Sequence, residues 1–250
     1  MKIIKKTREV GKSAGVLVPK SWLNKNVAVE LIPSDFQTIT KDVLEILIRE
    51  NLLNEVIGIY LAGSYARNEE TPYSDVDLLV ATSKTERLIK EENYEIYCIN
   101  EERIINSLNK DLFMVAMLIE AKPLLNEKSL EGYKALINAK NFKLSILSSI
   151  KRVLKLNETI MENEKEINNG IIYSLVLRLR ELYILDCILK NKIPTKKEFL
   201  KIVNNNHLYE IYEGIKEDKI QEGHTKIQEA TILLNKSIDF LKKWERKKTS

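Results

Sequence analysis

The chain has 250 residues, of which 44% are hydrophobic and 30% charged, and its formal net charge at pH 7 is +4. These values are ordinary for a folded globular protein and exclude a disordered or fibrous chain. The apolar runs are far shorter than the roughly 20 residues that a membrane-spanning helix needs, and the opening residues MKIIKKTREVGKS contain no apolar signal-peptide core. We therefore expect a cytoplasmic protein with one or two domains and no membrane partner.

Residues 1–32 are predicted to form short strands and turns. β-Branched residues alternate here with polar ones, and the two clearest strand segments are 16–18 and 27–31. The first 25 residues carry seven lysines and arginines against a single acid, Glu9. A basic segment of this kind suits contact with nucleic-acid phosphates, and a solvated chain end is the alternative.

Residues 34–138 are predicted to form an α/β domain with a small sheet. Ser34 and Gln37 have the spacing of a capping box, which predicts that a helix begins here. The hydrophobic period then predicts a helical face over 43–52, strands at 56–61, 76–81 and 94–99, and helices over 101–120 and 129–138.

From residue 140 to the last residue, 250, the apolar residues recur at the helical period, and proline and glycine are rare. This pattern predicts an antiparallel helical bundle as a third domain, 140–250. The expected fold class is therefore α+β: an N-terminal hairpin segment, a core with a small mixed sheet, and a C-terminal bundle. Arg178 and Arg180 of the bundle are predicted either to face a ligand cleft or to be solvated.

A glycine and a serine follow the first strand of the middle domain. Gly63 lets the backbone approach a ligand closely, and Ser64 can cap the turn with its hydroxyl while exposed N–H groups face an anion. This arrangement suits a phosphate group.

Two carboxylates, Asp75 and Asp77, are two residues apart on the next predicted strand, so both side chains leave the same face, about 6.6 Å apart along the strand. Val76, Leu78 and Val80 then face the core. Two carboxylates held in this way can bind divalent cations, and Mg²⁺ favours few carboxylates together with phosphate oxygens. Either motif alone is typical of an ordinary turn or a strand edge, but the two in this order favour a nucleotide site.

The segment GSYARNEETPYSDVDLLV, residues 63–80, resembles the signature of the polymerase-β-type nucleotidyltransferase superfamily, especially its minimal archaeal and bacterial members. The resemblance extends over about 55–125. It implies that a nucleoside monophosphate moves from an NTP, with ATP favoured, to an acceptor while pyrophosphate leaves. It also implies that Gly63 and Ser64 hold the phosphates and that Asp75 and Asp77 bind two Mg²⁺ ions.

Three further residues complete the comparison with that signature. Arg67 matches the family's arginine and is expected to steady the phosphates or the helix. Asn68 replaces the usual glycine, and asparagine tolerates the left-handed conformation, so the turn is expected to survive. The family needs a third carboxylate, for which Glu95 is the candidate; the alternative is a strand glutamate paired with a lysine. Glu101 and Glu102 are less favoured, because acids at a helix start are common.

Residues 9–32, EVGKSAGVLVPKSWLNKNVAVELI, resemble the swapped-hairpin DNA-binding domains of AbrB- and MazE-type regulators. That resemblance implies a homodimer that binds DNA, and the alternative is a hairpin that packs on the transferase domain. The minimal transferases imply protein AMPylation in toxin–antitoxin pairs, so the expected acceptor is a protein side chain or a small hydroxylated molecule. The alternative function is a DNA-binding regulator or antitoxin whose transferase fold is only a scaffold.

Overall fold

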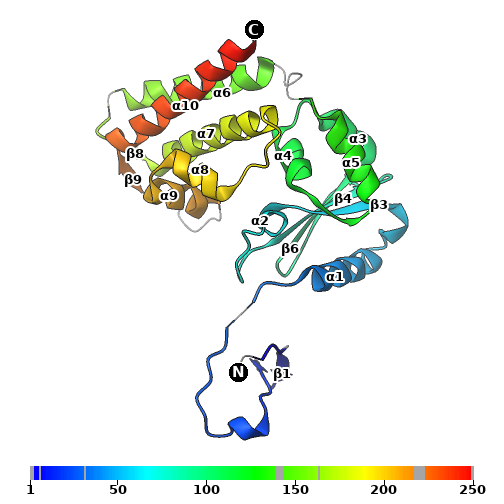
Figure 1. Ribbon diagram of the computed structural model, residues 1–250. Helices are drawn as coiled ribbons and strands as arrows, with labels where there is room; N and C mark the ends of the chain where they lie inside the picture. The colour runs from blue at the N-terminus through cyan, green and yellow to red at the C-terminus, as the bar shows by residue number, and fades with distance from the viewer. Residues whose placement is uncertain are drawn as a thin grey trace. The chain divides into compact units, whose positions relative to one another are not determined.

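The computed structural model describes residues 3–5, 7–30, 32–138, 144–162, 164–216 and 223–248. The chain forms two compact units, residues 1–32 and residues 33–250. It has the α+β fold expected from the sequence, with a five-stranded mixed sheet and many helices (Figure 1). In the described part of the chain, no helix has both the length and the apolar character needed to cross a bilayer.

The first unit contains a short antiparallel hairpin, in which β1 (Arg8–Val10) pairs with β2 (Ser13–Gly15). Gly11 allows the tight turn between them with a φ of 61°. The strands predicted at 16–18 and 27–31 are wrong: 16–18 and 27–30 form no strand, and Leu31 lies outside the described residues. These apolar segments have no second sheet within the described part of this unit to cover them, whereas the Gly11 turn pairs its neighbours locally. The 3-10 helix η1 (Lys20–Trp22) completes the unit.

The second unit is built around one sheet with the strand order β5-β6-β4-β3-β7. Only β4 and β6 run parallel, and the other neighbours are antiparallel. Its strands are β3 (Val56–Leu61), β4 (Val76–Thr82), β5 (Arg87–Glu91), β6 (Tyr94–Asn100) and β7 (Lys122–Leu125). The three predicted strands are confirmed within one residue. The two unpredicted strands are at the sheet edges, where one is highly charged and the other contains a proline, as edge strands permit.

Helices cover both faces of this sheet (Figure 1). On one face lies α1 (Phe36–Arg49), and on the other lie α3 (Glu101–Ser107), α4 (Leu112–Glu120) and α5 (Glu127–Leu136). The predicted capping box is wrong by one residue: Asp35, not Ser34, accepts the first-turn N–H, from Thr38 at 2.8 Å. The predicted helix over 101–120 is divided, because Asp111 caps a new helix.

The bundle is formed by α6 (Leu144–Met161), α7 (Asn169–Leu189), α8 (Lys196–Val203), α9 (Asn206–Lys216) and α10 (Ile227–Lys248). The central helix α7 packs against α6, α9 and α10, and also against α4 of the sheet layer. Val115 of α4 belongs to the same apolar core as the bundle helices. Two short strands, β8 (Glu166–Asn168) and β9 (His224–Lys226), pair beside it and were not predicted. The packing of α4 against α7, with Val115 in the shared core, holds the bundle next to the sheet.

Candidate active site

Asp77 and Glu95 lie side by side on the two parallel strands of the sheet. The register of β4 and β6 places Asp77 directly opposite Glu95. Val76, Leu78 and Val80 are buried in the core under α1, as the strand pattern predicts. Asp75 immediately precedes β4 and is exposed, whereas Asp77 is half-buried. The sheet therefore presents a pair of carboxylates, Asp77 and Glu95, from two strands. A third carboxylate, Asp75, lies directly before the first residue of β4.

The carboxyl group of Asp77 is in an unfavourable electrostatic environment. Burial, followed by the negative charges of Glu95, Glu120 and Asp75, raises its pKa to about 6, although Lys216 of α9 acts in the opposite direction. A carboxylate that the fold holds against desolvation and like charges is typical of a functional site.

Glu95 is half-buried and already has two partners. Its Oε1 accepts from Lys90 Nζ at 2.6 Å, and its Oε2 accepts from the Tyr97 hydroxyl at 3.0 Å. The bond from Lys90 is the main cause of a lowered pKa of this carboxyl group. The lysine pairing weighed in the sequence analysis is therefore present, together with the position beside Asp77. Of the less favoured acids, Glu101 accepts from the Tyr133 hydroxyl at 2.6 Å.

Gly63 occupies a position that no other residue can take without strain. Its φ is 64°, and a Cβ added to it would lie 2.0 Å from Asp77 Oδ2. Its N–H donates to Glu120 Oε1 at 2.8 Å. The glycine thus lets the backbone approach the half-buried Asp77 carboxylate directly.

The turn after β3 becomes the short helix α2 (Gly63–Arg67). The helix has no side-chain cap, and Ser64 lies inside its first turn, so the predicted capping role of Ser64 is wrong. Asn68 ends the helix in the left-handed conformation, with a φ of 54°, as its sequence position predicts. Lys122 Nζ donates to the Asn68 side chain at 2.7 Å and fixes this end of the turn.

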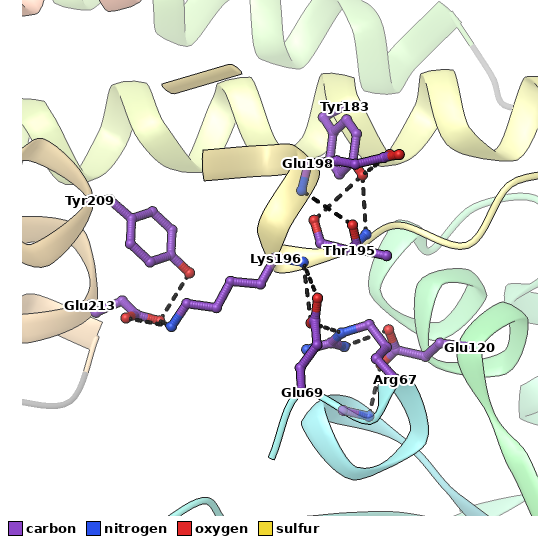
Figure 2. A network of polar contacts seen from close by, with 10 residues as sticks. Arg67, Glu69, Glu120, Tyr183, Thr195, Lys196, Glu198, Tyr209 and Glu213 are labelled. Atoms are coloured by element: carbon purple, nitrogen blue, oxygen red, sulfur yellow. Dashed lines mark hydrogen bonds and ion pairs between the residues drawn. The ribbon is translucent and has the colours of Figure 1, made fainter. Parts of the chain in front are cut away.

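Arg67 lies between two glutamates, as Figure 2 shows. Its Nε donates to Glu69 at 2.8 Å and its Nη1 to Glu120 at 2.6 Å. All three side chains are largely buried, with exposed fractions of 15%, 20% and 9% for Arg67, Glu69 and Glu120. Burial raises the pKa of Glu120, although Arg67 opposes the change.

The model of the nucleotidyltransferase domain family matches residues 41–202 of the second unit, which include the whole five-stranded sheet and part of the bundle. The chain belongs to this family. It is a transferase enzyme that uses a nucleotide as substrate. No curated protein sequence matches the nucleotidyltransferase at a significant level.

Two solved structures resemble the nucleotidyltransferase in fold. A nucleotidyltransferase-like protein from Exiguobacterium sibiricum is 16% identical, with 82% of this chain and 75% of that chain covered and a TM-score of 0.36. Spectinomycin adenyltransferase AAD(9) from Enterococcus faecialis, crystallised with ATP and spectinomycin, is 15% identical, with 82% and 98% covered and a TM-score of 0.46. At these identities and TM-scores neither structure identifies the acceptor of this chain.

Members of this family use a divalent metal ion with the nucleotide, and the donor set of this chain fits such an ion. Asp75, Asp77 and Glu95 would supply hard oxygen ligands, and the raised pKa of Asp77 marks a place where negative charge lacks compensation. Among the described residues, no three carboxylate, histidine or cysteine side chains already converge on one metal position. Glu95, the third of these carboxylates, is bonded to Lys90 and Tyr97 in this structure.

One of the two bundle arginines named in the sequence analysis acts on Glu120. Arg180 Nη1 donates to the Tyr212 hydroxyl at 2.9 Å, and its charge, like that of Arg67, opposes the rise that burial causes in the pKa of Glu120. Arg178 instead pairs with Glu181 on its own helix at 2.8 Å. Of the two predicted arginines, Arg180 is thus the one whose charge acts on the site.

Sequence reasoning did not predict the roles of Glu69 and Glu120. Glu120 ends the helix sequence LFMVAMLIE, and all the residues before it in that helix are apolar. A lone acid on such a helix is a signal that could have identified it, because a buried carboxylate needs a partner.

A hollow of about 410 Å³ lies next to Glu69 and is lined by Glu69, Lys196, Lys197, Leu200 and Lys201.

Proposed function

We propose that this enzyme transfers a nucleoside monophosphate from an NTP, with ATP as the favoured donor, to a hydroxyl group of its acceptor. Asp75, Asp77 and Glu95 act as the acidic residues of the site. The observation that carries the proposal is the position of Asp77, opposite Glu95 in the sheet and in contact with Gly63, with its pKa raised to about 6. A strand, a glycine turn and a half-buried carboxylate at the same point favour phosphate chemistry over a structural role.

The reaction forms one bond and breaks one. The acceptor oxygen bonds to the α-phosphorus, the bond from that phosphorus to the bridging oxygen breaks, and pyrophosphate leaves. The acceptor proton passes to a carboxylate of the site. Two Mg²⁺ ions held by Asp75, Asp77 and Glu95 would neutralise phosphate charge and favour the ionised acceptor.

The protein groups have separate parts in this reaction. Gly63 and Ser64 would line the β- and γ-phosphates at a turn without a bulky side chain, while the Gly63 N–H itself donates to Glu120. The positive charge of Lys216 partly offsets the negative charges of Asp77 and Glu95 before the nucleotide binds. The contacts of Arg67 with two glutamates favour its role on the helix over one on the phosphates.

The acceptor is a small hydroxylated molecule or a protein side chain, and one experiment separates the two. The purified enzyme is incubated with Mg²⁺ and each α-labelled NTP in turn, with and without cell extract divided into protein and small-molecule fractions. Label appearing in a product of either fraction, with release of pyrophosphate, identifies the acceptor class. Release of phosphate alone from every NTP would refute nucleotidyl transfer.

A second function, DNA binding by a homodimer, is favoured by the first unit. No described residue in 1–32 is buried, and its large apolar side chains are exposed at Ile4, Val10, Leu17, Val18, Leu23, Val27, Val29 and Ile32. So much exposed apolar surface on so few residues favours burial against a second copy. Lys5, Arg8, Lys12 and Lys20 would then supply a shared basic surface, while Lys6 lies outside the described residues.

A further inference from the structure

We propose that Glu120, Arg67 and Glu69 form a positioning relay that ties the glycine turn to the start of α8, so that the bundle's position sets nucleotide affinity. The inference rests on the proposed function, because it takes Gly63 and Ser64 as the phosphate-contacting residues. It makes Arg67 a positioning residue and not a ligand of the phosphates.

The first link of the relay is Glu120. Its two carboxylate oxygens have different donors: Oε1 accepts from the Gly63 N–H at 2.8 Å, and Oε2 accepts from Arg67 Nη1 at 2.6 Å. The same glycine touches Asp77, since an added Cβ would lie 2.0 Å from its Oδ2. Glu120 therefore fixes the peptide N–H of the glycine that lies against the half-buried Asp77 carboxylate.

The second link is Arg67, which is held on two sides. Its Nη1 contacts Glu120 and its Nε contacts Glu69, so two of its three nitrogens are already paired with carboxylates. A planar guanidinium with two fixed partners has little freedom to turn toward a ligand. Breaking either largely buried pair would leave a charge without compensation, so the three side chains are expected to move together.

The third link reaches the bundle. Both oxygens of Glu69 accept from the backbone N–H of Lys196, at 3.1 and 3.2 Å, at the first residue of α8 (Figure 2). This carboxylate comes from a different part of the chain and compensates the positive end of the helix. Burial opposes ionisation of Glu69, but Arg67 and the Lys196 N–H outweigh it, and the pKa of Glu69 is lowered.

The relay continues into α9 on the far side of Lys196. Lys196 Nζ pairs with Glu213 at 2.9 Å, and the Tyr209 hydroxyl donates to the same carboxylate at 2.9 Å (Figure 2). Three residues further along α9 is Lys216, whose charge acts on Asp77 and Glu95. A displacement of α8 and α9 would thus change both the glycine turn and the charge that faces the acids.

The test compares Glu69→Gln, Glu120→Gln and the double variant with Glu198→Gln. Glu198 is the matched control: it lies in the first turn of the same helix and accepts from the Tyr183 hydroxyl at 3.0 Å. Affinity is measured by titration with a fluorescent ATP analogue and Mg²⁺, and amide hydrogen exchange is followed at the peptide that includes Gly63. Thermal unfolding identifies any general loss of stability.

The relay predicts a Kd about five times higher for Glu69→Gln and about ten times higher for Glu120→Gln. The double variant should resemble Glu120→Gln alone, because the two changes break one pathway. KM for ATP should rise with kcat nearly unchanged, and exchange at Gly63 should be faster in all three variants than in Glu198→Gln.

Unchanged affinity in Glu69→Gln, or an equal loss in Glu198→Gln, would overturn the relay. Tighter binding in Glu69→Gln would also overturn it, because a released Arg67 would then be a direct phosphate ligand. A wild-type enzyme that binds no nucleotide would refute the proposed function. In that case hydrogen exchange still tests whether Glu69 is coupled to the Gly63 turn. Unaltered exchange at Gly63 in Glu69→Gln would reject that coupling.

Discussion

The environment of Asp77 has a cost in stability, which the proposed catalytic role would explain. It is half-buried beside other acids, and its pKa of about 6 is above the ordinary value of 3.8. The folded state therefore binds the Asp77 proton more readily than the unfolded state does. Its ionised form destabilises the fold above pH 6, and this penalty disappears as the pH falls toward 4.

This sign gives a prediction for the metal-free protein. Asp77→Asn should raise the melting temperature at pH 8 by about 2–4 °C, which corresponds to roughly 1 kcal/mol after allowance for partial solvent exposure. The gain should shrink through pH 6 and vanish near pH 4. Calorimetric melts in a chelating buffer at several pH values measure it, and a variant less stable than the wild type at pH 8 would contradict the assigned environment.

Gly63 is predicted to be irreplaceable for activity. Gly63→Ala places a Cβ against Asp77 and imposes a left-handed φ on alanine, at a cost of about 1–2 kcal/mol, so we expect transfer to fall at least a hundredfold. Gly132→Ala is the control, because Gly132 lies in α5 with nothing within 4 Å of an added Cβ, and it should be neutral or slightly stabilising. Initial rates and melting curves of both variants decide the point; an active Gly63→Ala enzyme would refute the contact.

Glu95 separates a catalytic role from a structural ion pair. Glu95→Gln should cripple turnover and leave NTP binding comparatively intact, because Asp75 and Asp77 still bind the metal of the nucleotide. Lys90→Ala removes the partner but keeps the carboxylate, so it should retain activity. If instead both variants turn over like the wild type, Glu95 is only the partner of Lys90, and Glu101 or Glu102 becomes the next candidate.

At the scale of elements, the central strands were predictable and the edges were not. β4 and β6 are buried on alternating or continuous apolar patterns, which the hydrophobic period detects. β5 and β7 have partners on one side only, so nothing in their own sequences demands a strand. One apolar period runs through residues 101–120, so the sequence predicted a single helix there. In the structure the segment forms two helices, α3 and α4, and Asp111 caps the second.

The site was only partly predictable for a similar reason. Gly63, Asp75 and Asp77 are close in sequence, so their spacing could indicate a phosphate turn and a carboxylate strand. The contacts of Glu120 with Gly63 and of Glu69 with α8 join residues that are 57 and 127 positions apart. Such pairs depend on tertiary packing, which no local pattern encodes. The strand register that sets Glu95 opposite Asp77 is likewise a property of the sheet.

At the scale of the whole molecule, residues 1–32 form a unit of their own and residues 33–250 another. Deletion of 1–32 is therefore expected to leave nucleotidyl transfer intact while it abolishes dimerisation and DNA binding. Light scattering and gel shifts over a range of salt concentrations test this, since phosphate contacts weaken steeply as salt rises. A monomeric full-length protein that retains no DNA at low salt would reject the proposed second function.

The central claim is that Asp77 serves nucleotidyl transfer at the sheet beside Gly63. The most direct measurement is the rate of pyrophosphate release with Mg²⁺ and the preferred α-labelled NTP, for wild type, Asp77→Asn and the exposed-site control Asp239→Asn. We predict a loss of several orders of magnitude in Asp77→Asn, which folds and melts no lower than the wild type, and an unchanged rate in Asp239→Asn. Turnover at the wild-type rate by folded Asp77→Asn would contradict the account.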